Sequence, residues 1–395
     1  MELHNLITCI DFEISSLCNA GCSVCMRRRH GHFSEFKQTY WTIDDVKSHI
    51  DLEIIKNLKN LILCGNFGDT MGNPDVVKIV KYFKENNPNL PIDINTNGGI
   101  GNAKDFEELA ELGVHMVFGL DGMGSSNELY RVNVKWDKVL ENLNAFISKC
   151  NPNQLEIQFI MWSETTDQII PMIEFIQSIG FGRLFLRRPY TTGIKTEVYN
   201  MQGESTHFLT EIKNIELQKY LETFWNFEQL EKLKSDLLKI DLTPNPLELG
   251  NFLVKPKNIF PKKDYTYTEE NFSYEEIQKL KSIEKQTCYS KNFMKPEDLV
   301  NNNYNIYITH DKLLMPCCMI TPNISNSIHH HSGEESSYQK EILNKMLKIG
   351  FEKFSLKNKT LKEVFNNGVL HKFVYTDLES NNPLKMCKIL CGKCN

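Results

Sequence analysis

Apolar and polar residues alternate in two rhythms over the first half of the chain. Short apolar runs of strand length recur between stretches whose apolar residues lie three or four positions apart, the spacing of a helix with one buried face. The predicted strands, between residues 6 and 188, are LITCIDFEI, NLILCG, PIDINT, VHMVFGLDG, QLEIQFIM and GRLFLRR. Six strands alternating with helices are typical of an α/β fold with a parallel sheet. Right-handed crossovers would curl the sheet into an open, partial barrel, with the carboxyl end of every strand on one rim.

Residue types at the predicted helix ends support this interpretation. Thr42 opens a Thr-Ile-Asp-Asp segment that can cap a helix start, and Gly113 and Gly180 follow helix ends as C-cap glycines. The predicted helices include PDVVKIVKYFKE, AKDFEELAELG, KVLENLNAFISKC and QIIPMIEFIQSIG. Each lies between two predicted strands, as the alternation requires.

The second half of the chain loses this alternation. Residues 191–287 are rich in Lys, Glu, Asn and Tyr, and their clearest pattern is one helix around LQKYLETFWNFEQLEKLKSDLLK. Residues 288–395 contain a hairpin in NIYITHDKLLMPCCMI, with a turn near residues 310–312, then a helix in LKEVFNNGVLHKF and a cysteine-rich end. We therefore expect a barrel core over residues 1–190, a bridging insertion over 191–287, and a small cysteine-rich α+β domain over 288–395. Because so few residues make a weak core alone, we expect a metal staple in the last unit.

Composition restricts the setting in which the protein works. The chain has 395 residues, 41% of them hydrophobic, and a formal net charge of −5. No apolar run approaches the roughly 20 residues of a membrane span, and the first residues carry acids where a signal peptide needs a basic start. We expect a cytoplasmic protein without a membrane partner. The net charge gives no general attraction to nucleic acid.

The most informative chemistry lies directly after the first predicted strand. Cys18, Cys22 and Cys25 stand within eight residues of one another. Three thiolates on one tight loop can hold three irons of a cubane iron–sulfur cluster and leave the fourth iron open to another ligand. The alternative is a zinc site, which needs a fourth ligand such as His30 or His32 to complete a tetrahedron.

Cysteines elsewhere fall into two classes. Cys9, Cys64 and Cys150 stand alone and are expected to be small buried hydrophobes. Six more cluster toward the C-terminal end, which in a cytoplasmic chain indicates metal binding rather than disulfides. They are Cys288, Cys317, Cys318, Cys387, Cys391 and Cys394. The last three repeat the spacing of the first triplet, but the chain stops at residue 395, so only the first triplet can belong to the barrel.

The C-x3-C-x2-C spacing after a first strand resembles the signature of the radical S-adenosylmethionine (radical SAM) superfamily. The residue before the third cysteine is usually aromatic in that family, and here it is Val24. The resemblance implies a partial (β/α)6 TIM-like barrel of the radical SAM type, a [4Fe–4S] cluster on the three cysteines, and SAM bound through the open iron. It also implies an electron donor such as flavodoxin or ferredoxin.

Further segments at the predicted strand ends are similar to motifs of this family. CGNFGDTMGNP matches a glycine-rich turn that ends in an acidic residue, NTNGG matches a T-N-G segment, and GLDG matches an S-x-D-G stretch with Gly119 in place of serine. The resemblance therefore implies SAM contacts at Gly68, Asp69, Thr96, Asn97, Asp121 and Arg131. Asp69 would take the methionine ammonium, and the guanidinium fork of Arg131 suits its carboxylate. The alternative role for Asp69 and for Asp121 is a helix or turn cap. The alternative for Arg131 is a surface ion pair.

The roles of two groups of arginines are not decided by the sequence. Arg27, Arg28 and Arg29 form either a solvated loop or a counter-charge for a cluster or an acidic substrate. One of Arg187 and Arg188, at the end of the sixth strand, is a candidate contact for substrate or cofactor, and the other should face helices or solvent.

The C-terminal cysteines resemble those of SPASM or twitch domains, which carry auxiliary iron–sulfur clusters in radical SAM maturases. The resemblance implies one auxiliary cluster held by Cys288, Cys317, Cys387, Cys391 and Cys394, with Cys318 pointing the other way along a strand. Zinc binding by four of these residues is the alternative.

Three functions follow from these patterns. The first is a radical SAM enzyme that abstracts hydrogen from a peptide or protein substrate through a 5′-deoxyadenosyl radical. The second is the same chemistry on a small-molecule or nucleotide-derived substrate, which the adjacent arginines would favour if it carries phosphate. The third is a non-catalytic binding module in which zinc occupies both cysteine clusters.

Overall fold

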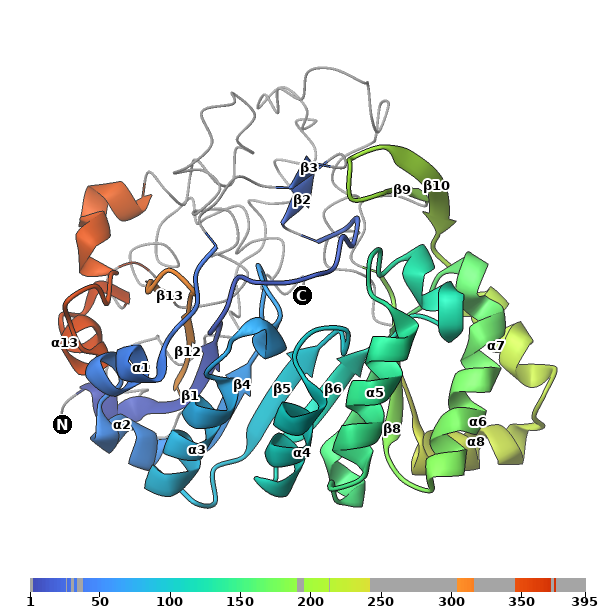
Figure 1. Ribbon diagram of the computed structural model, residues 1–395, viewed down its shortest axis with the longest axis horizontal. Helices are drawn as coiled ribbons and strands as arrows, with labels where there is room; N and C mark the ends of the chain where they lie inside the picture. The colour runs from blue at the N-terminus through green and yellow to red at the C-terminus, as the bar shows by residue number, and fades with distance from the viewer. Residues whose placement is uncertain are drawn as a thin grey trace, which may run out of the picture.

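A curved, mostly parallel sheet forms the centre of the protein (Figure 1). The computed structural model describes residues 3–25, 27–29, 32–33, 38–189, 195–212, 214–241, 304–315, 345–370 and 373. Within these ranges the main sheet has nine strands, in the order β11-β8-β7-β6-β5-β4-β1-β12-β13. Their bounds are β1 Ile7–Phe12, β4 Asn60–Leu63, β5 Ile92–Thr96, β6 His115–Gly119, β7 Leu155–Ile160, β8 Arg183–Arg187, β11 Leu238–Asp241, β12 Tyr304–Ile308 and β13 Leu314–Met315.

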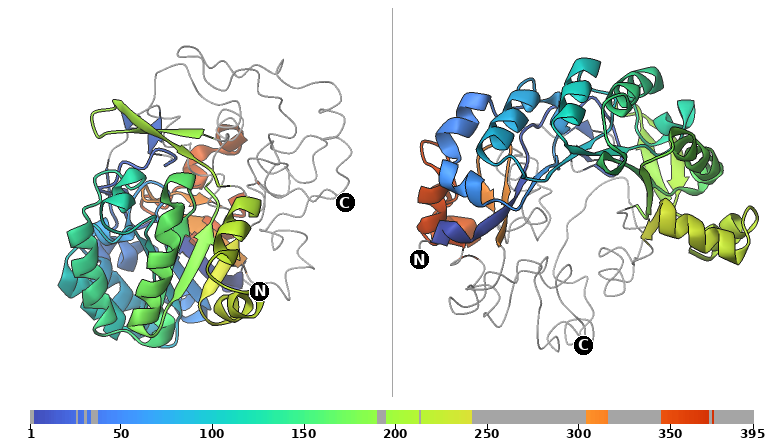
Figure 2. Two further views of the ribbon diagram at one scale, coloured as in Figure 1. Left: turned by 90° about the vertical axis from the view of Figure 1, so that its right-hand side faces the viewer. Right: turned by 90° about the horizontal axis from the view of Figure 1, so that it is seen from below.

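Helices follow the strands and lie on the outer side of the curve, which is clearest in the view from below in Figure 2. Their bounds are α1 Ile43–His49, α2 Leu52–Asn57, α3 Val76–Asn86, α4 Ala103–Glu111, α5 Trp136–Ile147, α6 Ile169–Ile179, α7 Asn214–Glu222, α8 Phe227–Asp236 and α13 Leu361–Asn366. No helix in the described ranges is long and apolar enough to cross a bilayer.

The six strands predicted from the sequence are present as β1, β4, β5, β6, β7 and β8. They lie side by side in chain order and every neighbouring pair is parallel. All six carboxyl ends therefore meet on one rim, and the arc seen in Figure 2 is the predicted open barrel.

The two faces of the sheet differ in chemistry. In β7, Leu155, Ile157 and Phe159 are buried, whereas the alternating residues Glu156 and Gln158 are only half-buried. The same alternation holds in β5, where Ile92 and Ile94 are buried. Successive strand residues point to opposite faces, so one face packs on the helices and the inner face carries the polar residues.

Helix ends predicted from the sequence are confirmed. The Thr42 hydroxyl accepts a hydrogen bond from the Asp45 backbone N–H, and the Asp45 carboxylate accepts one from the Thr42 N–H, which completes a capping box at the start of α1. Gly180 ends α6 with a φ of 80°, in the left-handed region that glycine tolerates best.

The helix expected over the segment LQKYLETFWNFEQLEKLKSDLLK is wrong as one element. The chain forms α7 and α8, and the second helix is restarted by Asn226, whose side chain accepts from the Gln229 N–H at 2.9 Å in a capping box. The last residues of the segment enter β11, which pairs with β8 in parallel. The apolar residues keep a helical spacing through both helices, so the sequence pattern did not reveal the cap between them.

The hairpin expected near residues 310–312 is confirmed, with β12 and β13 antiparallel and Lys312 at a φ of 67°. Its surroundings differ from the expectation of a self-contained unit, because β12 pairs in parallel with β1 and extends the main sheet. The Trp41 indole N–H also donates to the Thr309 carbonyl at 3.0 Å. The end of β12 therefore lies on the same rim as the end of β1.

The isolated cysteines are less buried than expected. Cys9, Cys64 and Cys150 are half-buried, and the Cys64 thiol donates to the Asp11 carboxylate at 2.7 Å. The C-terminal cysteines from Cys288 onward lie outside the described residues, so their assignment stays a prediction.

Candidate active site at the rim of the sheet

The loop that follows β1 carries the cysteine triplet and is folded tightly. Cys22 is buried, with 8% of its surface exposed, and Cys18 and Cys25 are half-buried. The Cys25 N–H donates to the Cys22 carbonyl at 3.1 Å, and the Ala20 N–H donates to the Cys18 sulfur at 3.4 Å. These bonds turn the loop back on itself, and each thiol lies near enough to another to raise its pKa.

Three neighbouring strand ends hold this loop in place. The turn after β4 donates the Asp69 N–H to the Leu17 carbonyl at 2.8 Å. In the turn after β5, the Gly99 carbonyl accepts a hydrogen bond from the Asn19 side chain at 3.0 Å. In the segment after β6, the Val132 carbonyl accepts a hydrogen bond from the Gly21 N–H at 2.8 Å. The loop is therefore positioned by the rim itself.

Burial governs the electrostatics of the thiols. It raises the pKa of Cys18 to about 12 and of Cys22 to about 11, and it raises the pKa of Cys25 as well. Each thiol further raises the pKa of another, while the nearby Arg27 charge lowers the pKa of all three. Without a cation, the three sulfurs would hold protons at neutral pH, and a metal centre would displace these protons as it binds.

The donor set fits an iron–sulfur cluster better than a single ion. In the described part of the chain, no three His, Cys, Asp or Glu side chains are arranged to hold one metal ion. Zinc ligands must converge on a single point at about 2.3 Å, whereas the thiolates of a cubane sit on three different irons and stay apart. A cubane with one open iron therefore suits a set of three cysteines on one loop, because it requires no fourth ligand from the protein.

Glycines in the turn after β4 let it approach the cysteine loop closely. A Cβ on Gly68 would collide with the Ser15 carbonyl, and one on Gly65 would collide with the Gly68 carbonyl. The turn therefore packs backbone against backbone, as the glycine-rich pattern predicted.

Asp69, at the end of this turn, is buried and already bonded within the protein. Its carboxylate accepts from the Met71 N–H at 3.0 Å, the Thr96 hydroxyl at 2.8 Å and the Asn97 N–H at 2.7 Å. Burial raises its pKa, and these three donors oppose the shift. A carboxylate offers about four acceptor positions, so one remains for a ligand. Both interpretations from the sequence, a turn cap and a ligand contact, are therefore compatible with this geometry.

Asn97 joins the same turn to the cysteine loop. Its side-chain amide lies 3.5 Å from the Cys18 sulfur and donates to the Asn19 side chain at 2.9 Å. Asn97 and Thr96 are both buried. The structure thus brings Thr96 and Asn97 together with Asp69 and Cys18.

Asp121, which is buried, and Arg131, which is half-buried, form an ion pair beside the loop. The Arg131 Nε donates to Asp121 Oδ2 at 2.5 Å, and Asp121 Oδ1 accepts from the Ile160 N–H at 2.5 Å. Burial would lower the pKa of Arg131, but the Asp121 carboxylate and the Cys22 thiol raise it, so the guanidinium stays charged. Burial raises the pKa of Asp121, and the Arg131 charge opposes that shift.

The terminal nitrogens of Arg131 are left for another partner. Within the described residues, neither Nη atom makes a hydrogen bond. A Cβ on Gly119 would lie 2.6 Å from Arg131 Nη2, so the absence of a side chain there gives the guanidinium its space. The departure from the family's serine at Gly119 is thus coupled to the position of Arg131.

Two features of this rim were missed or left open by the sequence. Glu13 is fully buried and accepts from the Phe67 N–H at 2.5 Å and from His310 Nδ1 at 2.8 Å, which fixes the glycine-rich turn against the end of β12. Burial would lower the pKa of His310, but its bond to Glu13 raises it. The only sequence signal for this contact was that Glu13 continues the alternation of residues that face the inner side of the sheet along β1.

Two of the three arginines in the run, Arg27 and Arg28, are buried. Arg27 and Arg28 are 5% and 3% exposed, and Arg27 Nη2 donates to the Cys18 carbonyl at 3.3 Å. At the far end of the rim, Arg188 donates through Nε to Glu211 at 2.5 Å, while the guanidinium of Arg187 lies 5.3 Å from the ring centre of Phe185. The interpretation of Arg27 and Arg28 as solvent-exposed is therefore wrong.

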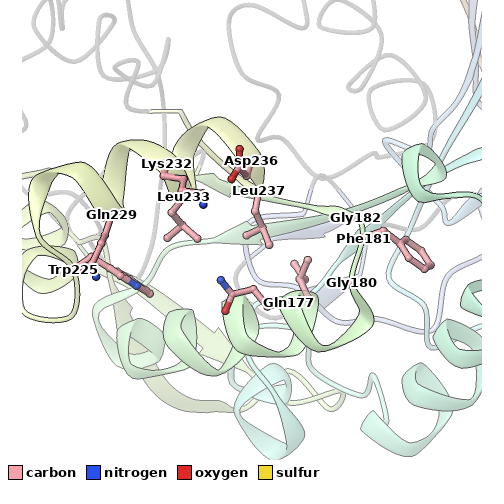
Figure 3. Close-up of a pocket in the computed structure, with 11 residues that line it drawn as sticks. Gln177, Gly180, Phe181, Gly182, Trp225, Gln229, Lys232, Leu233, Asp236 and Leu237 are labelled. Carbon is pink, nitrogen blue, oxygen red and sulfur yellow. The ribbon is translucent and has the colours of Figure 1, made fainter.

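A pocket of about 490 Å³ lies away from this rim, between α6 and α8 (Figure 3). Gly180, Phe181 and Gly182 on its wall precede β8, so it opens at the amino ends of the strands. None of the predicted site residues lines it.

Comparisons with solved structures show a shared fold at low sequence identity. A histidine-tagged form of anSMEcpe with bound AdoMet matches at a TM-score of 0.52 with 13% identity, over 95% of this chain and 81% of that one. "Native anSMEcpe with bound AdoMet and Cp18Cys peptide" matches at 0.51 with 14% identity, over 97% and 87%.

A third structure is SuiB from Streptococcus suis bound to S-adenosylmethionine, at a TM-score of 0.47 and 12% identity. The match covers 86% of this chain but 64% of SuiB. The curated proteins give no match. A family model does match: the radical SAM superfamily model covers residues 12–176, the part of the chain that holds the cysteine loop and its three supporting strand ends.

Proposed function

We propose that this protein is an enzyme that holds a [4Fe–4S] cluster on Cys18, Cys22 and Cys25 and cleaves SAM reductively. The observation that carries the proposal is the grouping of three thiols on one buried loop, held by the ends of three successive strands. When bound, the cluster supplies one electron to SAM, whose carbon–sulfur bond then breaks to give a 5′-deoxyadenosyl radical.

The surrounding residues would bind and orient the methionine part of SAM. Arg131 offers two Nη donors that suit a carboxylate, and Asp121 holds the guanidinium in position through Nε. Asp69 offers its one remaining acceptor position to the ammonium, next to the close backbone approach that Gly68 allows. Thr96 and Asn97 keep Asp69 and the loop in register.

The test is anaerobic reconstitution with iron and sulfide, followed by reduction in the presence of SAM. We expect a brown protein, about four irons at the N-terminal site, and release of 5′-deoxyadenosine that requires a reductant. Flavodoxin or ferredoxin should replace the chemical reductant, as expected for an enzyme of the cytoplasm.

Replacing Cys18, Cys22 and Cys25 together with Ala should abolish 5′-deoxyadenosine release. The matched control is Cys150→Ala, at the far end of α5, which should retain it. Release that survives in the triple variant, or a colourless protein with stoichiometric zinc, would overturn the proposal.

We further propose a peptide or protein as the substrate. The support is the shared fold with anSMEcpe, whose structure holds AdoMet together with a peptide. The competing substrate is a small or nucleotide-derived molecule, for which Arg187 at the rim is the candidate contact. Peptide pools and nucleotide pools should be compared for stimulation of 5′-deoxyadenosine release, and stimulation by nucleotides alone would reject the peptide.

The C-terminal cysteines complete the proposal. We assign an auxiliary cluster to Cys288, Cys317, Cys387, Cys391 and Cys394, on the sequence pattern alone. In the triple Cys→Ala variant of the N-terminal loop, about four irons should remain per chain if this cluster is a cubane. Zinc in their place, or no metal, would rule the auxiliary cluster out.

A further inference from the structure

A hairpin far along the chain reaches the cysteine loop. Strands β9 (Lys195–Tyr199) and β10 (Ser205–Thr210) form an antiparallel pair after β8, separate from the main sheet. Figure 1 shows this hairpin above the rim, on the side toward the short strand β2 (Arg28–Arg29). At its base, the Thr210 N–H donates to Glu164 at 2.7 Å. Nearer the tip, His207 Nε2 lies 2.9 Å from the Leu129 carbonyl. The hairpin is thus attached to the rim along β10.

At its tip, the hairpin is attached to the cysteine loop by one arginine. Arg28 is 3% exposed, and its Nη1 donates to the Gly21 carbonyl at 2.6 Å and to the Tyr199 carbonyl at 2.8 Å. Its Nη2 donates to the Asn200 carbonyl. One planar guanidinium therefore joins the loop to a segment 171 residues away in the sequence.

The Arg28 and Met201 side chains pack closely on Gly21 at this junction. A Cβ on Gly21 would lie 2.8 Å from Arg28 Nη1 and 2.8 Å from the Met201 sulfur. Gly21 precedes Cys22, and the Arg28 N–H bonds to the Cys25 carbonyl at 2.9 Å. The junction therefore spans the segment that carries two of the three thiols.

We propose that the β9–β10 hairpin is a latch on the cysteine loop, and that Arg28 is the positioning residue that holds it closed. The latch fixes the Cys22–Cys25 segment and limits solvent access to whatever that segment binds. A lysine could not replace Arg28, because a single ammonium cannot present the fork that meets carbonyls on both segments.

The first test needs no metal, so it stays separate from the proposed cluster function. Hydrogen exchange of the metal-free chain should show faster exchange of the amides in residues 195–210 in Arg28→Gln and Arg28→Lys, by at least tenfold, with the strands of the sheet unchanged. The matched control is Arg183→Gln, which removes the same charge at the exposed amino end of β8. Exchange in Arg28→Gln equal to that of the control would overturn the latch.

Gly21→Ala supplies a second route that keeps the arginine. Its methyl group enters the space of Arg28 and Met201, so the same hairpin amides should exchange faster. If residues 195–210 keep their protection in this variant as well, the tip contacts do not hold the hairpin.

The second readout concerns the loaded protein and rests on the proposed function. On exposure to air, the visible iron–sulfur absorbance should bleach several times faster in Arg28→Gln than in Arg183→Gln. Equal bleaching rates would overturn the role of the latch in limiting solvent access. A wild-type chain that never acquires a cluster would reject the proposed function instead, while the exchange experiment would still decide the latch.

Discussion

Asp69 and Asp121 occupy matching places in the barrel and are held in different ways. Each follows an inner strand by a few residues and each is almost fully buried. Asp69 accepts only from neutral donors, two backbone N–H groups and a hydroxyl. Asp121 accepts from one backbone N–H and from the guanidinium of Arg131.

The difference separates two tasks on one rim. The neutral donors around Asp69 tie the turns after β4 and β5 together and thereby fix the cysteine loop. The ion pair at Asp121 uses only Nε of the arginine, so two charged donors remain for an anionic ligand. Asp69 thus holds the frame and keeps one acceptor position for a ligand, whereas Asp121 orients the guanidinium of Arg131.

Loss of Arg131 should have the largest effect. Arg131→Ala leaves the Asp121 charge buried without a partner, and breaking a buried pair in this way costs about 3 to 5 kcal/mol. Urea unfolding of the metal-free protein should show this loss. The double variant Asp121→Asn, Arg131→Gln should recover part of it, because no charge is left unpaired. A loss below about 1 kcal/mol in Arg131→Ala would show that the pair is not effectively buried.

Asp69→Ala should have the next largest effect, on the frame through three unpaired donors and on ligand binding through the lost ammonium contact. The loss of a charge-assisted bond to the ammonium costs about 1.5 to 3 kcal/mol, or roughly ten- to a hundredfold in SAM affinity by calorimetry. Thr96→Val is the control, since it removes one of the three donors to the carboxylate and keeps the charge. If Asp69→Ala binds SAM as tightly as the wild type, Asp69 has a structural role and does not contact the ammonium.

Much of this rim could be predicted from the sequence because its signals are local. Strand periodicity, the cysteine spacing and the glycine-rich turn each lie within a dozen residues, and all appear where they were expected. The capping box at Thr42 is equally local. A short segment carries such features whatever the rest of the chain does.

The features that were missed depend on contacts between distant segments. The junction of Arg28 with Tyr199 and the bond between Glu13 and His310 join residues 171 and 297 positions apart. No periodicity reports such a partner. The pairing of β12 with β1 was missed for the same reason, since strand patterns give the strand but not its neighbour.

The raised pKa of Asp69 gives a further test, which depends on pH. Burial raises the pKa of Asp69, so the native state binds its proton more tightly than the unfolded chain does. The contribution is fully present below the ordinary aspartate pKa of about 3.9 and is lost as pH rises through the folded value. This contribution lowers the melting temperature of the metal-free protein as pH rises through the window, and carboxylates with lowered pKa values, such as Asp45 and Asp75, contribute in the opposite direction. The difference in melting temperature between the wild type and Asp69→Asn should therefore change with pH. A difference that does not depend on pH would mean that Asp69 does not titrate there.

The smallest expected effect concerns the space above Gly119. In Gly119→Ala the new methyl group would meet three atoms of the Arg131 guanidinium, at 2.6 to 3.2 Å, so the arginine must shift while Asp121 still holds its Nε. Such a displacement costs about 0.5 to 1.5 kcal/mol, and we expect SAM affinity to fall about three- to tenfold. The control is the same change in the Arg131→Ala background, where these atoms are gone and Gly119→Ala should have no further effect on affinity. If Gly119→Ala weakens SAM binding equally in both backgrounds, the glycine acts on the ligand directly and not through Arg131.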